Sequence, residues 1–368
     1  MISELRLFNY RGFQEFLLSG CSRVNLFVGK NNAGKSSLLE ALYLYACRMD
    51  IEVLQSIAMR RGEIVEDPRG RDSYTVDLSH FFYGHRIKSS KTPSLVGKLA
   101  SYTIKFDESN KILPEMGLFQ FDDETSLRRP LHTLKIVETR KGGDNDIQEA
   151  VMYEHGGVSI VRRNNPYTAA MRRKNQFITP YSLDNQSLAR LWNNILVSNE
   201  EDSIVSALKL LDDRVSSIAF LSNEQFAGRF ISRSVAGFVV GMDGASRRVP
   251  LGSLGDGMKR LLAIATALAS AKGGALFIDE IDAGFHYSVM TDLWKLIIKT
   301  AITNNVQVFA STHSLDCIRG LSILKSEELN DFENVFSLYS VDSSCHEATR
   351  YSAEEIYRII SNEVEVRQ

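Results

Sequence analysis

The chain has 368 residues, enough for one large domain or two smaller ones with a substantial buried core. Its 43 basic and 45 acidic residues nearly cancel, so the net charge does not favour binding to nucleic acid or to an acidic membrane. Any surface that binds such a partner would have to be a local basic patch. The four cysteines are scattered without a Cys-x-x-Cys pair, which suits a reducing compartment and argues against a zinc site or a disulfide scaffold.

Neither a secretory signal nor a membrane span is expected. The first 13 residues carry Glu4, Arg6 and Arg11 and lack the apolar core of a signal peptide. The longest apolar stretch, Leu261 to Ala271, is too short to cross a bilayer. We therefore expect a cytoplasmic protein with no membrane partner.

Two strands open the chain, and the first chemical motif follows them. Ile2–Phe8 alternates apolar and polar residues and predicts a strand, and Gln14–Leu18 can return beside it. Residues 29–36 then read Gly-Lys-Asn-Asn-Ala-Gly-Lys-Ser, a complete G-x-x-x-x-G-K-S phosphate loop. It stands between an apolar run, Val24–Val28, and a helical pattern, Ser37–Ala46, which is the strand–loop–helix setting that such a loop requires.

The phosphate loop predicts ATP as the ligand and Mg²⁺ as its cofactor. Its glycines let backbone N–H groups point at phosphate oxygens, and the helix N-terminus adds partial positive charge. Lys35 is expected to reach the β- and γ-phosphates, and the Ser36 hydroxyl to ligate Mg²⁺. Further nucleotide contacts are expected from Asn31, Asn32, Ala33, Gly34 and Ser37.

Short strands and a small insertion are expected in the middle of the chain. Four alternating runs predict antiparallel strands that cover the nucleotide-binding lobe, namely Tyr74–Leu78, Ser101–Phe106, Met116–Phe121 and Leu131–Val137. Residues 49–71 show no clear pattern, and Leu183–Leu211 predicts two amphipathic helices. We therefore predict an N-terminal lobe at 1–140, a basic and helical insertion at 141–204, and a C-terminal lobe at 205–368.

The insertion contains a basic cluster. Arg162-Arg163 and Arg172-Arg173-Lys174 flank Tyr167, a pattern that could contact DNA. Such clusters more often form a solvated face or a partner-binding surface. DNA therefore stays a weakly supported partner.

The second half resumes a strand–helix alternation. Strands are predicted at Ser234–Val240, Ser246–Pro250, Ala275–Asp279, Val306–Ser311 and Phe336–Val341, and helices at Asp256–Ala271, Val289–Thr300 and near Leu315. Ser352 to Glu355 form a capping box that opens a last helix. This order predicts an α/β chain with a largely parallel sheet.

Two carboxylates end the strand at Ala275–Asp279. The run Ala-Leu-Phe-Ile-Asp-Glu is a Walker B pattern, which places Asp279 and Glu280 at the carboxyl edge of the sheet beside the phosphate loop. Asp279 is expected to bind the Mg²⁺ shell, and Glu280 to polarise the attacking water. A strand followed by an acidic turn is common, so this interpretation depends on the phosphate loop upstream.

Two further motifs surround the Walker B strand. Before it, the hydroxyl of Ser253, the bare N–H groups of Gly255 and Gly257, and a helix N-terminus predict a second anion site. After it, His313 follows an apolar strand and is expected to contact the γ-phosphate and orient water. A lone histidine at a strand end is usually structural, so its position in the motif order gives it this role.

The order of these motifs resembles the ABC-type ATPase superfamily over nearly the whole chain. More narrowly, it resembles the AAA-type ATP-binding proteins related to SMC proteins and to OLD (overcoming lysogenization defect) ATPases. The segments that carry this resemblance are Phe8–Phe13, Gly29–Ser37, Ser253–Arg260, Glu280–His286 and Ser311–Ser314. It implies an α/β, ABC-type P-loop ATPase fold with a mixed or parallel core sheet, an antiparallel β lobe and a small helical insertion.

The resemblance also implies roles and partners. Arg11 would touch the nucleotide phosphates, and Asp282–His286 would cross a dimer interface. The segment that starts at Ser253 would dock on the γ-phosphate bound by a second chain, which implies an ATP-gated homodimer or a larger assembly. The glutamine that this family uses as a further metal ligand has no clean match, although Asp77 and His80 lie near its expected position.

Three functions remain open on the sequence. Only residues 314–368 follow His313, too few for the TOPRIM nuclease domain of OLD proteins, and no long coiled coil is predicted. The leading hypothesis is an Mg²⁺-dependent ATPase that regulates a separate effector, such as a nuclease, with anti-phage defence as one setting. The alternatives are a DNA-repair or chromosome-associated SMC-like ATPase that binds DNA, and the ATPase subunit of a membrane transporter.

Overall fold

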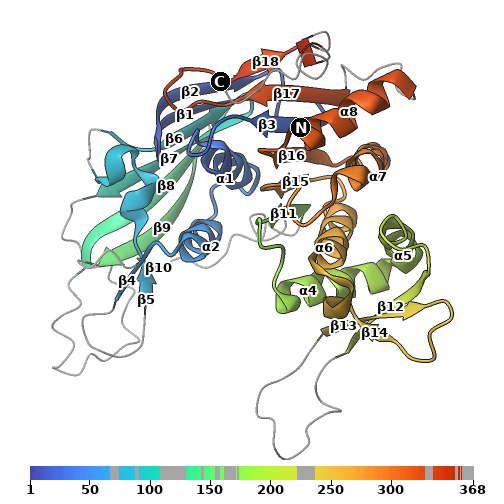
Figure 1. Cartoon of the computed structure of the whole chain (residues 1–368). Coiled ribbons are helices and arrows are strands. Elements are labelled where there is room, and N and C mark those ends of the chain that lie inside the picture. Colours follow the sequence, from blue (N-terminus) through green and yellow to red (C-terminus); the bar gives the residue numbers. More distant parts are fainter. Residues whose placement is uncertain are drawn as a thin grey trace, which may run out of the picture.

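A computed structural model describes residues 1–66, 74–87, 91–107, 130–141, 145–153, 158–160, 171, 174–221, 237–327, 335–352, 355, 356 and 358. The described chain has an α/β architecture built around two large sheets (Figure 1). One is a six-stranded, largely parallel sheet in the order β11-β15-β16-β3-β17-β18, and the other is a seven-stranded antiparallel sheet in the order β10-β9-β8-β7-β6-β1-β2. The predicted fold class is therefore confirmed.

The largely parallel sheet carries the chemistry-bearing motifs. Its strands are β3 (Val24–Val28), β11 (Asn175–Ile178), β15 (Ala275–Ile278), β16 (Gln307–Ser311), β17 (Phe336–Ser340) and β18 (Thr349–Tyr351), and only the β17–β18 pair is antiparallel. All residues of β3, β15 and β16 are buried, as expected of parallel strands covered on both faces. Because parallel strands share their carboxyl edge, the phosphate loop, Asp279 and Thr312 all follow strands at that edge.

The antiparallel sheet forms a lobe beside the parallel one. It contains β1 (Glu4–Tyr10), β2 (Phe13–Ser19), β6 (Ser94–Gly97), β7 (Ala100–Asp107), β8 (Pro130–Arg140), β9 (Asn145–Tyr153) and β10 (Val158–Ile160). The short hairpin of β4 (Ile64–Glu66) and β5 (Tyr74–Val76) stands apart from it. The strands predicted at 2–8, 14–18, 101–106 and 131–137 are confirmed, whereas the one predicted at Met116–Phe121 lies outside the described residues.

Helices bury both faces of the parallel sheet. α1 (Lys35–Ala46) lies between the two sheets, with α2 (Ile51–Arg61) beside it (Figure 1). Side chains alternate along each strand, so Phe277 and Phe309 join the core around α1, whereas Leu276 and Val308 join the core on the opposite face. That face is covered by α6 (Asp256–Ser270) and α7 (Met290–Thr303), followed along the chain by α8 (Leu315–Glu327).

Residues 141–204, predicted as one insertion, are spread over the fold. β9 and β10 extend the antiparallel sheet, β11 pairs in parallel with β15 at the edge of the other sheet, and α4 (Asn185–Ser198) packs against α6. Next come α5 (Glu201–Leu208) and a small sheet of β12 (Val215–Leu221), β13 (Gly237–Met242) and β14 (Val249–Pro250). The cluster Arg162, Arg163, Tyr167, Arg172 and Arg173 lies outside the described residues, and the three-part division remains a proposal.

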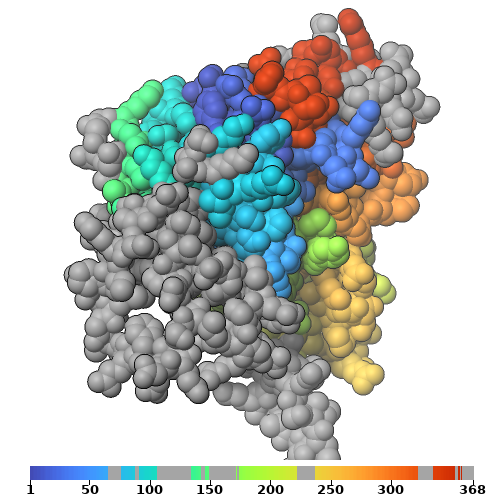
Figure 2. All heavy atoms as spheres, turned by 90° about the vertical axis from the view of Figure 1, so that its left-hand side faces the viewer, coloured from blue at the N-terminus to red at the C-terminus, as the bar shows by residue number. Residues whose placement is uncertain are grey.

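The two terminal thirds of the chain meet beside β2. The backbone N–H of Leu17 donates to the carbonyl of His346 at 2.8 Å, and the N–H of Ala348 donates to that of Leu17 at 2.9 Å. Figure 2 shows the N-terminal residues in blue and the C-terminal ones in red side by side on this face. Among the described helices, none combines the length and apolar character needed to cross a membrane.

Candidate nucleotide site

The phosphate loop is shaped by its two glycines and by the residues they contact. Gly29 and Gly34 have φ of 145° and 95°, values that side-chain-bearing residues rarely adopt. A Cβ on Gly34 would lie 2.6 Å from Cζ of Phe13, and one on Gly29 would lie 2.5 Å from the carbonyl oxygen of Val341. The chain therefore needs glycine at both positions, and Phe13 from the N-terminal motif supports the turn into α1.

Lys35 lies folded against its own loop. Its Nζ donates to the carbonyls of Gly29 at 2.9 Å and Lys30 at 2.7 Å. Burial lowers the pKa of Lys35 to about 8, although the nearby carboxylates of Asp279 and Glu280 oppose that shift. A bound phosphate would replace the two carbonyls as partner, which is the exchange expected of a phosphate-loop lysine.

The Walker B carboxylate meets the phosphate loop directly. The hydroxyl of Ser36 donates to Oδ1 of Asp279 at 3.0 Å, so the two predicted Mg²⁺ ligands lie together. The hydroxyl of Ser311, at the end of β16, donates to the same oxygen at 2.5 Å. A hydroxyl and a carboxylate are the hard oxygen ligands that Mg²⁺ uses next to substrate phosphates, so the residues present fit this metal.

Glu280 lies in a turn whose backbone is hydrogen-bonded by two side chains. Its φ of 50° is uncommon for a residue with a side chain. Its N–H donates to Oγ of Ser311 at 2.9 Å, while the buried guanidinium of Arg260 donates to the carbonyls of Asp279 and Glu280 at 2.7 and 2.9 Å. Sequence reasoning identified Glu280 but gave no role to Ser311 or Arg260, although both lie inside the quoted motifs.

The end of β16 is tied to the segment at 282–286. The hydroxyl of Thr312 donates to Oδ1 of Asp282 at 2.5 Å and accepts from the N–H of Ser314 at 2.9 Å. The N–H of Thr312 donates to the carbonyl of Phe27 in β3 at 3.1 Å. His313, the predicted γ-phosphate contact, follows directly and is half-buried at the same sheet edge.

The predicted second anion site is exposed. Ser253 and Gly255 lie at the surface where the short helix η5 (Leu251–Leu254) turns into α6. Gly255 has φ of 92°, and a Cβ on Gly257 would lie 2.7 Å from the carbonyl oxygen of Gly284. The start of α6 therefore packs against the 282–286 segment while Ser253 and Gly255 remain accessible to another molecule.

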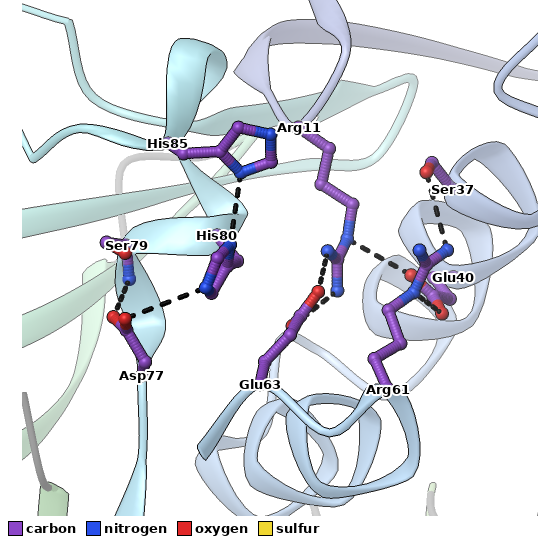
Figure 3. Close-up of polar contacts among 9 residues, drawn as sticks. All are labelled: Arg11, Ser37, Glu40, Arg61, Glu63, Asp77, Ser79, His80 and His85. Carbon is purple, nitrogen blue, oxygen red and sulfur yellow. Dashed lines mark hydrogen bonds and ion pairs between the residues drawn. The ribbon is translucent and has the colours of Figure 1, made fainter. Parts of the chain in front are cut away.

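Arg11 lies in a buried ion-pair network beside α1 rather than alone near the phosphate loop (Figure 3). Its two terminal nitrogens donate to the carboxylate of Glu63 at 2.5 and 3.1 Å, and its Nε lies 3.1 Å from Oε2 of Glu40. Arg61 pairs with the other oxygen of Glu40 at 2.7 Å, and the Arg11 guanidinium stacks 4.4 Å from the ring centroid of Phe81. A phosphate contact by Arg11 remains a prediction, and it would require the carboxylates to give way.

Near this network, Figure 3 shows two facing imidazoles. Nδ1 of His80 and Nδ1 of His85 lie 3.1 Å apart, and Nε2 of His80 lies 3.6 Å from the carboxylate of Asp77. One hydrogen bond between the two rings accounts for this spacing. Within the described residues, no group of three or more His, Cys, Asp or Glu side chains could hold a metal ion.

Two protein-family models match the chain. Residues 1–120, which hold the phosphate loop, match "AAA ATPase domain". Residues 173–316, which hold Ser253, the Walker B strand and His313, match "AAA domain, putative AbiEii toxin, Type IV TA system".

Similar proteins extend this picture. An "ATP/GTP phosphatase" of Helicobacter pylori is 24% identical over 372 residues, covering 95% of this chain and 96% of that protein. The "DNA replication and repair protein RecF" of Bacillus cytotoxicus is 44% identical over 45 residues, 12% of each chain. Among solved structures, an Smc head bound to the C-terminal winged-helix domain of ScpA covers 96% of this chain and 98% of its own, with a TM-score of 0.48 and 11% identity.

Proposed function

We propose that this chain, an AAA-type ATPase of the ABC-like class, acts as an ATP-gated switch that dimerises on ATP and regulates a separate effector. The observation that carries the proposal is the contact between Ser36 and Asp279, with Glu280 next along the same turn. It joins the two halves of an ATPase centre that are far apart in the sequence. The full-length similarity to an ATP/GTP phosphatase supports the same chemistry.

Hydrolysis would divide among the residues at the sheet edge. Lys35 and the loop N–H groups bind the β- and γ-phosphates, while Ser36 and Asp279 hold Mg²⁺, which neutralises phosphate charge when bound. Glu280 accepts a hydrogen bond from the attacking water and polarises it. Water oxygen bonds to the γ-phosphorus and the bond from that phosphorus to the bridging oxygen breaks. ADP and inorganic phosphate then leave; the phosphate keeps the oxygen and one proton of the water, and the other proton passes to solvent. His313 would orient the water or the γ-phosphate.

Dimerisation would complete this centre. The exposed start of α6 offers the Ser253 hydroxyl, the N–H groups of Gly255 and Gly257, and the positive end of a 15-residue helix. These groups suit the γ-phosphate held by a second copy of the chain. Because ATP would bind the closed dimer more tightly than the separated chains, linkage makes ATP stabilise the dimer and hydrolysis release it.

Light scattering tests the gating. With ATP, Glu280→Gln should trap the dimer or a larger assembly, since it keeps the nucleotide contacts and loses water activation. Ser253→Arg in the Glu280→Gln background should prevent association by steric and charge conflict. Ser206→Arg, an equal change on the exposed face of α5, is the matched control. A mass that ignores nucleotide in every variant would contradict the gating proposal.

The effector is proposed to be a separate chain, such as a nuclease, and anti-phage defence is the proposed setting. The match to a family described as a putative toxin of a type IV toxin–antitoxin system supports a role of this kind. The purified chain should leave DNA intact in Mg²⁺ or Mn²⁺. Cleavage that persists through further purification and disappears in a Lys35→Ala variant would show that the chain itself cuts DNA.

A DNA-repair role is the second candidate. It is supported by the 45-residue similarity to the DNA replication and repair protein RecF. Under this alternative, double-stranded or single-stranded DNA should stimulate ATP turnover. Turnover that is indifferent to DNA favours the effector proposal.

A further inference from the structure

Arg260 is a buried arginine whose hydrogen-bond partners, within the part of the chain that the structure describes, are all backbone carbonyls. It lies in the second turn of α6 and is 2% exposed. Its guanidinium donates to the carbonyls of Asp279 and Glu280, and also to that of Thr179 at the end of β11. Burial of an arginine is costly unless its donors are used, so this placement calls for a reason.

The carbonyls that Arg260 holds belong to the catalytic turn. Glu280 has a left-handed backbone conformation, which is unfavourable for a residue with a side chain and therefore needs contacts that hold it. The N–H of the turn is held by Ser311. Its hydroxyl oxygen accepts from the N–H of Glu280, and its hydroxyl proton is donated to the carboxylate of Asp279. Arg260 fixes the acceptor side. Its Nη2 donates to both successive carbonyls of the turn, while Nη1 donates to the carbonyl of Thr179, so the planar guanidinium joins the turn to the end of β11. The single ammonium nitrogen of lysine cannot occupy both of these donor positions.

The same helix carries the surface that faces a second chain. Gly257, one turn before Arg260, packs against the carbonyl of Gly284, and Ser253 and Gly255 are exposed just before the helix. α6 also runs beside β11 and β15 (Figure 1). A displacement of the helix start would therefore shift the Arg260 guanidinium relative to the carboxyl end of β15.

We propose that Arg260 is a positioning residue for Glu280, and that it ties this carboxylate to the helix whose start receives the partner's phosphate. The second clause rests on the proposed ATP-bound dimer, whereas the first does not. Burial lowers the pKa of Arg260 to about 10, against the attraction of Asp279, Asp282 and Glu280, so the side chain remains charged at neutral pH.

The test compares Arg260→Lys with Arg48→Lys in the full chain. Arg48 is the matched control because its Nη2 also donates to two oxygens, both of them on buried Glu138 in the antiparallel lobe. Arg260→Lys should lower kcat on the order of 10- to 100-fold, the cost of a misplaced catalytic group, while KM and the ATP affinity stay at the wild-type value. Arg48→Lys should change neither kcat nor KM.

A second measurement separates positioning from general damage. Ser311→Ala loosens the other side of the same turn. If both residues position Glu280, the fold-loss in kcat of the double variant should be smaller than the product of the two single fold-losses. Independent, fully multiplicative losses, or a wild-type kcat in Arg260→Lys, would overturn the inference. If thermal unfolding shows that the lysine variant is not folded, Arg260→Gln replaces it with the same two outcomes.

Measurements in the Glu280→Gln background separate the role of Arg260 from ATP-gated dimerisation. In the Glu280→Gln background, Arg260→Lys should still associate on ATP as its parent does. If the parent itself does not associate, the gating proposal fails, while the kcat comparison still judges Arg260. If Arg260→Lys abolishes association along with ATP binding, Arg260 holds the nucleotide site as a whole and the positioning role is wrong.

Discussion

Two buried arginines flank the nucleotide site and are held in opposite ways. Arg11 in the β1–β2 turn is 4% exposed and is surrounded by the carboxylates of Glu40 and Glu63. Arg260 in α6 is 2% exposed and hydrogen-bonds only backbone carbonyls. Both arginines are charged. The charge of Arg11 is balanced by carboxylates in contact with it, whereas Arg260 places its charge beside the carbonyls of the catalytic turn.

This difference in partners predicts a structural role for Arg11 and a role in positioning Glu280 for Arg260. Arg11 links the N-terminal hairpin to Glu40 in α1 and to Glu63, two residues past the end of α2, so its loss leaves buried negative charge behind. Among the described residues Arg260 contacts no carboxylate oxygen, so its removal leaves no unpaired buried charge, but the turn loses the hydrogen bonds that hold it. We therefore expect variants on the Arg11 side to change the free energy of unfolding, and variants around Arg260 to change turnover.

The largest effect is expected on the catalytic side, at Glu280→Gln. The amide is isosteric and keeps the turn, but it cannot polarise water, so kcat should fall on the order of 10²- to 10⁴-fold. Phosphate release measures the rate, and nucleotide affinity should stay close to wild type because Lys35 and Ser36 are intact. Lys35→Ala provides the contrast, since it should lower affinity and turnover together. Wild-type hydrolysis by Glu280→Gln would show that the Walker B assignment is wrong.

On the Arg11 side, Arg11→Met should destabilise the fold by about 3–5 kcal/mol, the cost of removing one partner of a buried ion pair. Urea unfolding measures it. The double variant with Glu63→Gln should recover part of the loss, since one stranded charge is removed. Arg214→Met, which breaks an equally forked but exposed pair with Asp212, should leave stability unchanged. An Arg11→Met variant with wild-type stability and weak ATP binding would instead make Arg11 a nucleotide ligand.

Much of the fold was predictable because its signals are local. The buried strands at β3, β15 and β16 are predominantly apolar, and the capping box at Ser352 and Glu355 forms both reciprocal hydrogen bonds. α2 is not predicted from the sequence, because residues 49–71 show no clear apolar periodicity. Gly62, with φ of 68°, ends this helix, and Asp50 caps its start by accepting from the N–H of Glu52.

The parts that could not be predicted depend on distant partners. β11 is only four residues long, and its place is set by pairing with β15 and by the side chain of Asn175, which bonds Ala46 and Ala275. Likewise, the sequence predicted the identity of Lys35, Ser36 and Asp279 from motif spacing. It could not show that Glu40 and Glu63 surround Arg11, because those carboxylates belong to no motif.

Lys35 extends the comparison to a third cation, one that, like Arg260, hydrogen-bonds carbonyls. Its pKa of about 8 means that half of the chains have lost this proton at pH 8, whereas bound phosphate favours the protonated form. The contribution of Lys35 to ATP affinity should therefore be nearly constant below about pH 7, fall about twofold by pH 8 and fall about tenfold by pH 9. Calorimetric titration measures it, and Lys35→Arg should flatten the profile. A flat profile in the wild type would mean that Lys35 is charged throughout.

The smallest effect is expected at Arg61, which shares Glu40 with Arg11. Its side chain is 34% exposed, so solvent already screens the pair at 2.7 Å, and Glu40 keeps Arg11 as a partner when Arg61 is removed. Arg61→Met should therefore cost at most about 1 kcal/mol in urea unfolding. If it costs as much as Arg11→Met, Glu40 depends on Arg61 for its neutralisation. Arg11 would then be balanced by Glu63 alone, and the network would be two separate pairs.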